Sequence, residues 1–176
     1  MLIENMKLDK LYIRHYPDPI LRQKAENLTE IGDTIAALAE RMTEIMVKAG
    51  GIGLAATQVG VPLRMFIFSL TAKPEDVQVI INPELKNFQG VSEMEEGCLS
   101  LPDVRAKVRR PAACTLTARD LDGNEFTMDA VDMAATVIQH ETDHLDGKLF
   151  IDRLSTISRF ACRRGIRQLE EEFEDR

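Results

Sequence analysis

The chain has 176 residues, of which 44% are hydrophobic, so its composition suits one globular domain over residues 1–176 and excludes a disordered chain. Its 22 basic and 29 acidic residues give a formal net charge of −7, which argues against DNA binding and against general nucleic-acid binding. No apolar run reaches the roughly 18 residues of a membrane span, and the start of the chain does not resemble a signal peptide, so we expect neither membrane insertion nor secretion.

The N-terminal part of the chain predicts an irregular segment followed by a helix. Pro17 and Pro19 disfavour a helix within residues 1–28. Over residues 33–49, apolar side chains recur at steps of three and four, which predicts an amphipathic helix. Two consecutive glycines follow this segment and predict the end of the helix.

The middle of the chain predicts strands. Residues 64–70 and 77–82 are short apolar runs that are typical of buried strands. Residues 112–119 and 124–129 have the pattern of a β-hairpin, with Asp122-Gly123 supplying the turn.

Two further helices are predicted towards the C-terminus. Asp129 or Asp132 is the candidate N-cap of the first, which runs to about Leu145 and is closed by Gly147. Ser155 is the candidate N-cap of the second. Strands and helices do not alternate regularly along the chain, which favours an α+β fold over a doubly wound parallel sheet.

The most specific local pattern is HETDH at residues 140–144. His140 and His144 are four residues apart, so on an α-helix both imidazoles leave the same face and can bind one metal ion. Glu141 follows the first of them and can act as a general base on a water molecule at that ion. The alternative is a pair of surface histidines on an acidic helix end.

A catalytic metal site of this kind needs a third protein ligand. Cys98 is one candidate, because a thiolate binds Zn(II) or Fe(II) strongly and the neighbouring Gly97 allows close approach of the backbone. The chain has three cysteines, an odd number that argues against a disulfide framework and leaves at least one thiol free. Taken alone, Cys98 is better explained as a small buried hydrophobe. The glutamates at 170–172 are the other candidates, in the downstream position usual for metalloproteases, although they resemble a solvated helix end.

The segment GIGLAATQ at residues 51–58 is rich in small residues. It follows a helix and lacks the Lys-Ser/Thr pair of a phosphate loop, so nucleotide binding is a weak interpretation. Small residues permit close packing beside a cleft, and Gln58 offers an amide donor. The simpler alternative is a loop that caps the preceding helix.

Taken together, these segments resemble peptide deformylase. GIGLAATQ at 51–58, EGCLS at 96–100 and QHETDHLDG at 139–147 occur in the family's order and spacing, and the resemblance extends from YPDPILR at 16–22 to the C-terminal helix. It implies an α+β fold in which small antiparallel sheets pack around a central metal-binding helix, with an N-terminal and a C-terminal helix. It also implies a metal-dependent hydrolase that removes the formyl group from the N-terminal methionine of new polypeptides and releases formate.

The resemblance further implies roles for individual residues. The metal ligands would be Cys98, His140 and His144, with Glu141 as the general acid/base. The formyl oxygen would be held by Gln58 and the backbone N–H of Leu99. The substrate would be bound by Gly53, Arg105, Met133, Thr136 and Val137. Thr136 stands where a larger apolar side chain is common in the family.

Residues around the ligands are expected to support them. Glu96 and Gln139 are expected to orient the ligands as hydrogen-bond partners. Asp143 is expected to be structural, paired with Arg109 or Arg110.

The resemblance implies Fe(II) as the native metal, with Zn(II), Ni(II) or Co(II) as substitutes. It implies nascent chains that carry formyl-methionine as partners, and a bacterial, cytoplasmic location. On the C-terminal helix, Arg159, Arg163 and Arg167 form one stripe that would allow transient contact with ribosomal RNA, as in some members of the family. The alternative is a solvated face on which Arg167 pairs with Glu171.

Two other functions remain open at this point. One is a peptide-cleaving zinc metalloprotease with a downstream glutamate ligand. The other is a binding module without activity on the same fold, which would be expected to lack Glu141, Gln58 or a metal ligand, and none of these is missing.

Overall fold

The computed structural model describes residues 7–175. Its helices are α1 (Asp33–Lys48), α2 (Asp132–Leu145) and α3 (Thr156–Glu174). Its strands are β1 (Gly53–Ala55), β2 (Met65–Phe68), β3 (Gln78–Gln89), β4 (Ser92–Cys98), β5 (Leu101–Arg110), β6 (Ala113–Arg119) and β7 (Glu125–Val131). Short 3₁₀ helices lie in the connections: η1 (Leu8–Lys10), η2 (Pro19–Arg22), η3 (Ala56–Val59), η4 (Pro74–Asp76) and η5 (Phe150–Arg153).

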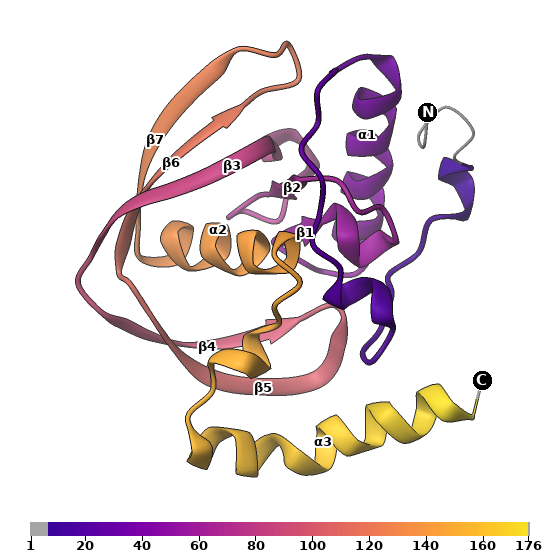
Figure 1. The fold of residues 1–176 in the computed structure, drawn as a ribbon, viewed down its shortest axis with the longest axis vertical. Helices are drawn as coiled ribbons and strands as arrows, with labels where there is room; N and C mark the ends of the chain where they lie inside the picture. The colour runs from indigo at the N-terminus through magenta and orange to yellow at the C-terminus, as the bar shows by residue number, and fades with distance from the viewer. Residues whose placement is uncertain (1–6, 176) are drawn as a thin grey trace.

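The strands form two antiparallel sheets on either side of α2. The larger sheet has five strands in the order β1-β2-β3-β6-β7, and the smaller is the β4-β5 pair. In Figure 1 the connections from β3 to β4 and from β5 to β6 curve around α2, which lies at the centre, while α3 crosses below the smaller sheet. This arrangement confirms the expected α+β fold with small antiparallel sheets around a central helix.

Three buried apolar clusters hold these layers together. The first packs α1 against β1, β2 and β3, with Leu38 fully buried. The second lies between the five-stranded sheet and α2 and includes Phe66 and Ile138. The third joins β5 to α3 and includes Val104 and Leu169. Each fully buried side chain of this size stabilises the fold by about 1.5–3 kcal/mol, so α2 is fixed by its apolar face and its other side is available for a site.

The elements predicted in the N-terminal half are largely confirmed. The segment 33–49 forms α1, and 64–70 contains β2. Of the segment 1–28 that is expected to be irregular, residues 7–28 are irregular apart from η1, η2 and an isolated bridge at Glu26, and residues 1–6 lie outside the described part of the chain. The strand expected at 77–82 is longer than predicted, because β3 continues to Gln89 and pairs there with β6.

The hairpin at β6 and β7 is also confirmed, with Gly123 supplying the positive φ of its turn. Strands β4 and β5 lie outside the predicted elements. In β5, buried and exposed positions alternate from Val104 to Arg110, but charged side chains fill the exposed positions and the last buried one. Only three apolar residues, Val104, Ala106 and Val108, mark the alternation, which is too few to identify the strand from the sequence.

The predicted N-cap of α2, Asp129 or Asp132, is wrong. Val131 is the N-cap, and it provides no side-chain hydrogen bond. The Asp129 carboxylate instead accepts a hydrogen bond from the Thr115 hydroxyl at 2.8 Å, across the hairpin. Asp132 lies in the first turn with a φ of 51°. The predicted end is confirmed, since Gly147 follows the helix with a φ of 70°.

Helix α3 begins as predicted. The Ser155 hydroxyl accepts a hydrogen bond from the Ser158 backbone N–H at 3.1 Å, and the helix then packs on β5. Within residues 7–175, no helix combines the length and the hydropathy that crossing a membrane requires.

Candidate metal centre

The two histidines of α2 and the cysteine at the end of β4 meet in one place. Cys98 Sγ lies 3.2 Å from His144 Nε2, and the His140 and His144 ring centroids are 5.0 Å apart. One ligand atom from each of the three residues lies within 4.8 Å of the others, so these described residues could together hold a metal ion, and they are called the metal-binding group below. His140 and His144 are buried and Cys98 is half-buried.

The donor atoms of this group fit a divalent metal ion. Zinc–ligand bonds of about 2.0–2.3 Å at tetrahedral angles place ligand atoms about 3.5 Å apart, close to the separation of Cys98 Sγ and His144 Nε2. Burial lowers the pKa of His144 well below 6.5, so this imidazole is neutral, as a ligand must be. Burial also lowers the pKa of His140, but the neighbouring Cys98 and Glu96 side chains outweigh it and raise that pKa well above 6.5. Metal binding would therefore displace a proton from His140.

Glu141 lies on α2 beside His140 and His144. Its side chain is buried, and burial raises its pKa to about 7 despite the opposing effect of His140. Its Oε2 atom is buried and has no hydrogen-bond partner. A Cβ atom placed on Gly53 would lie only 2.4 Å from Oε1, so the glycine in β1 provides the space for this carboxyl. A carboxyl with a pKa near neutrality can both accept and donate a proton there.

A buried ionic network contacts the Nδ1 side of the His140 ring. Glu96 Oε2 lies 2.8 Å from His140 Nδ1. The Arg110 guanidinium donates to Glu96 from Nε and Nη2, the latter at 2.9 Å, and to Asp143 from Nη1 at 2.8 Å. Burial raises the pKa of Glu96, but the hydrogen bonds from Arg110 and His140 outweigh it and lower that pKa to about 2. Glu96 therefore carries a negative charge that fixes the orientation of the His140 ring.

The expectations for the supporting residues are met in part. Glu96 contacts a histidine as expected, whereas the Gln139 amide donates to the backbone carbonyls of Pro111 and Ala135 and does not contact a ligand. Asp143 pairs with Arg110 and not with Arg109. It also accepts hydrogen bonds from the Arg153 guanidinium of η5, which closes the network towards the surface.

The GIGLAATQ segment forms part of the site. It contains β1 and η3, and Gln58 is buried with its amide held at both ends. Gln58 Oε1 accepts the Ala55 backbone N–H at 2.8 Å, and Nε2 donates to Ser100 Oγ at 3.1 Å. Nε2 also lies 3.4 Å from Cys98 Sγ, so one of its two protons is directed to the metal-binding group.

A pocket of about 560 Å³ opens beside this group. It lies between α2, the smaller sheet and the turn that follows α1. Its lining contains the site residues expected from the sequence apart from His144, namely Gly53, Gln58, Cys98, Leu99, Arg105, Met133, Thr136, Val137, His140 and Glu141.

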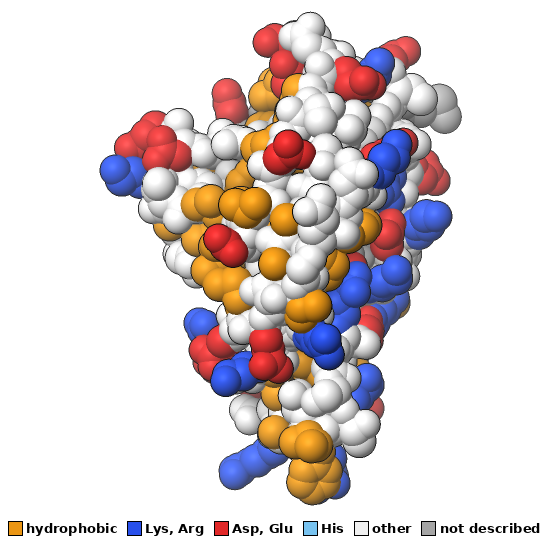
Figure 2. Space-filling model, turned by 90° about the vertical axis from the view of Figure 1, so that its left-hand side faces the viewer, with side chains coloured by type: hydrophobic (Ala, Val, Ile, Leu, Met, Phe, Trp, Pro, Cys, Tyr) orange, Lys and Arg blue, Asp and Glu red, His pale blue; other side chains and the backbone are white. Residues whose placement is uncertain are grey.

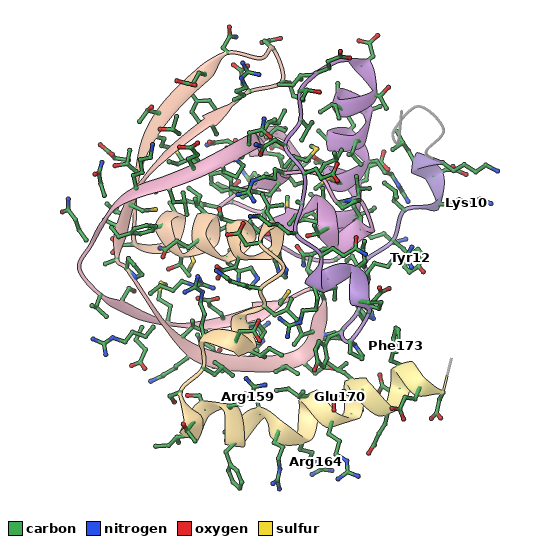
Figure 3. The ribbon with its side chains drawn as sticks, viewed as in Figure 1. Lys10, Tyr12, Arg159, Arg164, Glu170 and Phe173 are labelled. Carbon is green, nitrogen blue, oxygen red and sulfur yellow. The ribbon has the colours of Figure 1, made fainter. Side chains whose placement is uncertain are left out.

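The alternative ligands at 170–172 are not brought to this pocket. They lie on α3, and Glu170 Oε1 accepts a hydrogen bond from the Tyr16 hydroxyl at 2.8 Å. Figure 3 shows Glu170 on the side of α3 that faces the body of the molecule, below the smaller sheet. None of the three glutamates lines the pocket.

Three residues of the site are absent from the expectations drawn from the sequence. Ser100 anchors Gln58, Met94 lines the pocket and Arg153 closes the ionic network. Ser100 could have been found from the sequence, because it belongs to the EGCLS segment that contains Cys98. Met94 and Arg153 reach the site only through the tertiary fold.

A cysteine sulfur and two imidazoles beside a carboxyl with a near-neutral pKa, at a pocket in an α+β fold, are typical of a metallohydrolase. The family model described as polypeptide deformylase matches residues 10–160. A peptide deformylase of Acidobacterium capsulatum is 46% identical over 157 residues, covering 88% of this chain and 92% of the relative. One of Nitrosococcus oceani is 44% identical over 154 residues, with the same coverage.

The chain belongs to the peptide deformylase family, metal-dependent hydrolases that remove N-terminal formyl groups. Solved structures agree with this. A plant peptide deformylase superposes with a TM-score of 0.92 at 35% identity, covering 94% of this chain and 92% of the plant chain. A peptide deformylase from Legionella pneumophila gives a TM-score of 0.86 at 34% identity, covering 94% and 98% of the two chains.

Proposed function

We propose that this chain, acting as one catalytic domain, hydrolyses the formyl group of formyl-methionyl nascent polypeptides and releases formate. The observation that carries the proposal is the convergence of Cys98, His140 and His144 beside Glu141 at one pocket. The bacterial relatives support a cytoplasmic site of action.

The three ligands would hold Fe(II) in the native enzyme, with Zn(II), Ni(II) or Co(II) as substitutes. A donor set of one thiolate and two imidazoles accepts each of these ions. The bound ion supplies Lewis acidity, which lowers the pKa of water by several units and polarises a carbonyl.

Glu141 is proposed to move the proton. With a pKa of about 7 it takes a proton from the attacking water and returns it to the departing amine. Negative charge then develops on the formyl oxygen, where Gln58 Nε2 and the Leu99 backbone N–H are proposed to donate hydrogen bonds. Donors of this kind each contribute about 3 kcal/mol to stabilising the transition state. The contacts from Ala55 and Ser100 fix the Gln58 amide in advance, and the second Nε2 proton, which is directed to Cys98 Sγ, is the one that would be shared with the formyl oxygen.

The remaining lining residues would bind the peptide. The Gly53 backbone is proposed to hydrogen-bond the substrate main chain, and Arg105 to lie at the pocket rim. Met133, Thr136 and Val137 would surround the methionine side chain. All four side chains named here line the same pocket as the metal-binding group.

The test is anaerobic purification followed by metal analysis and a formate-release assay on a formyl-methionyl peptide. Replacing Cys98, His140 or His144 by Ala should remove most of the bound metal. Glu141→Ala should keep metal and fold but lower turnover by at least about 10²–10⁴-fold, because one acid/base group serves in two steps. Full metal occupancy in the Cys98 variant, or near-normal turnover in the Glu141 variant, would contradict the proposal.

The identity of the native metal is tested by comparing the activity of different metal forms. The iron enzyme should lose activity in air, and nickel substitution should preserve it, because Ni(II) is not readily oxidised. The anaerobic iron form and an aerobic zinc form are compared at equal occupancy. Equal turnover of these two forms would argue against iron as the native metal.

A second proposed interaction is transient contact with the ribosome through α3. At the start of this helix Ile157 and Phe160 are exposed by 84% and 68%, and the Arg163 guanidinium lies 4.8 Å from the Phe160 ring. Figure 2 shows hydrophobic side chains flanked by basic ones at this end of the molecule, and in Figure 3 Arg164 points away from the body. Solvation of a helix needs only polar side chains, so exposed apolar side chains among arginines favour an interaction surface.

Other contacts on α3 favour a solvated face instead. Arg167 pairs with Glu171 at 2.8 Å, and the Arg159 guanidinium contacts the Ile151 carbonyl at 3.5 Å. Ribosome co-sedimentation across a salt series, with an Arg159/Arg163/Arg167→Glu triple variant, separates the two. Docking predicts that only the wild type pellets at low salt. Equal pelleting of both proteins, or of neither, would leave the arginine stripe as a solvated face.

A further inference from the structure

One hydroxyl in the wall of the pocket has an unusual partner. Thr136 Oγ1 donates to the thioether sulfur of Met94 at an O–S distance of 3.4 Å. Thr136 is one helical turn before His140, so its side chain leaves the same face of α2. Met94 comes from β4, four residues before Cys98. Both side chains line the pocket that contains the metal-binding group.

Two other threonines within helices donate to the backbone instead. Thr43 in α1 and Thr142 in α2 each donate to the backbone carbonyl four residues earlier, Ala39 at 2.9 Å and Ile138 at 2.7 Å. That bond is the usual solution for a threonine within a helix. Thr136 is only 5% exposed and still directs its hydroxyl to a sulfur atom. A buried hydroxyl needs an acceptor, and a thioether is a weak one.

A methionine side chain in this pocket would bring a second thioether to the same wall. We propose that the Thr136 hydroxyl selects the sulfur of the substrate's N-terminal methionine over a hydrocarbon chain of the same length. The inference rests on the proposed function and adds a specificity-determining group to it. In the free enzyme the hydroxyl donates to Met94, and in the complex it rotates about χ1 to the substrate sulfur. Met94 is unbranched and flexible, so its own sulfur can move aside.

Norleucine is the matched probe, because a methylene group replaces the sulfur and cannot accept a hydrogen bond. The experiment compares kcat/KM for formyl-methionyl and formyl-norleucyl versions of one tripeptide. One whole net hydrogen bond corresponds to a preference of about two- to tenfold. Because norleucine leaves the bond to Met94 in place, the wild type should show the lower end of this range and Met94→Leu the upper end. Because both substrates meet the same metal and the same Glu141, their ratio isolates the pocket wall.

Two variants of Thr136 separate the hydroxyl from the shape of the side chain. Thr136→Val keeps the branched shape and removes the hydroxyl, so the ratio should fall to about one. Thr136→Ser keeps the hydroxyl and should retain the preference. Thr142→Val in the same helix removes a hydroxyl that is bonded to the backbone, and it should leave the ratio unchanged.

A variant of the competing acceptor gives an independent measurement. Met94→Leu removes the sulfur that holds the hydroxyl in the free enzyme, so the preference for methionine should increase. An unchanged ratio in Thr136→Val, or equal kcat/KM for the two substrates in the wild type, would overturn the inference while the deformylase activity stands. Turnover of neither substrate by the metal-loaded wild type would overturn the proposed function and this inference with it.

Discussion

The buried ionic network behind His140 allows a prediction whose size follows from the structure. The Arg110 side chain is only 1% exposed and donates to two carboxylates, those of Glu96 and Asp143. Arg110→Met keeps a long side chain in the same space but removes the charge and all of these hydrogen bonds. Asp143 retains Arg153 as a partner, whereas Glu96 is left with His140 alone.

The expected loss of stability is large. Removing one partner of a buried ion pair costs about 3–5 kcal/mol, because a charge remains buried without compensation. For a chain of this size, about 2–4 °C in Tm corresponds to each kcal/mol, so Tm should fall by about 6–20 °C. The pKa of Glu96, now held at about 2, should rise as its main partner is lost. In the wild type this low pKa stabilises the fold above the unfolded pKa near 4.5, and the contribution disappears as the pH falls towards 2.

The measurement is urea unfolding of chelator-treated protein, so that metal binding does not contribute. Arg109→Met is the matched control, because Arg109 is the exposed neighbour on the same strand, and it should change stability by less than about 0.5 kcal/mol. Combining Arg110→Met with Glu96→Gln should cost less than the sum of the single changes, since the orphaned charge is removed. A loss below about 1 kcal/mol for Arg110→Met would refute this account of the network.

Two further predictions concern single positions. Gly53→Ala should lower turnover by about 100-fold with metal retained, because the new Cβ would lie 2.4 Å from Glu141 Oε1 and displace it. Gly32→Ala adds a Cβ with no atom within 4 Å and should keep turnover close to wild type, so equal activity of the two variants would contradict the steric argument. Ser155→Ala should reduce the free energy of unfolding by about 1 kcal/mol, because the Ser158 N–H loses its acceptor. Urea unfolding measures this loss, and an unchanged midpoint would show that the cap contributes nothing.

Local patterns in the sequence are sufficient for the elements whose signal is local. The apolar spacing of 33–49 and the Asp-Gly turn of the hairpin predict structures that depend on neighbouring residues, and both are confirmed. The same holds for His140 and His144, whose spacing on one helix settles their common face. The predicted cap of α2 is wrong because Asp129 is bonded across the hairpin, a contact that its local sequence does not reveal.

Cys98 illustrates what a local pattern cannot supply. Taken alone it is better explained as a small hydrophobe, and only the resemblance to a family favours it over the glutamates at 170–172. The structure places it 3.2 Å from His144 Nε2 because β4 lies beneath α2, across 46 positions of sequence. That placement depends on how the smaller sheet packs, which no spacing within the chain encodes.

The sequence motifs leave the partner of Asp143 open between Arg109 and Arg110, and strand geometry decides between them. Successive side chains of a strand point to opposite faces, so only one of two adjacent arginines can face α2. In β5 the buried positions are Leu101, Val104, Ala106, Val108 and Arg110. The alternation that starts at Val104 therefore directs Arg110 inward and Arg109 to solvent. Because Arg110 is charged, the buried face of β5 does not read as an apolar face in the sequence. The same guanidinium binds Glu96 and orients its carboxylate towards His140.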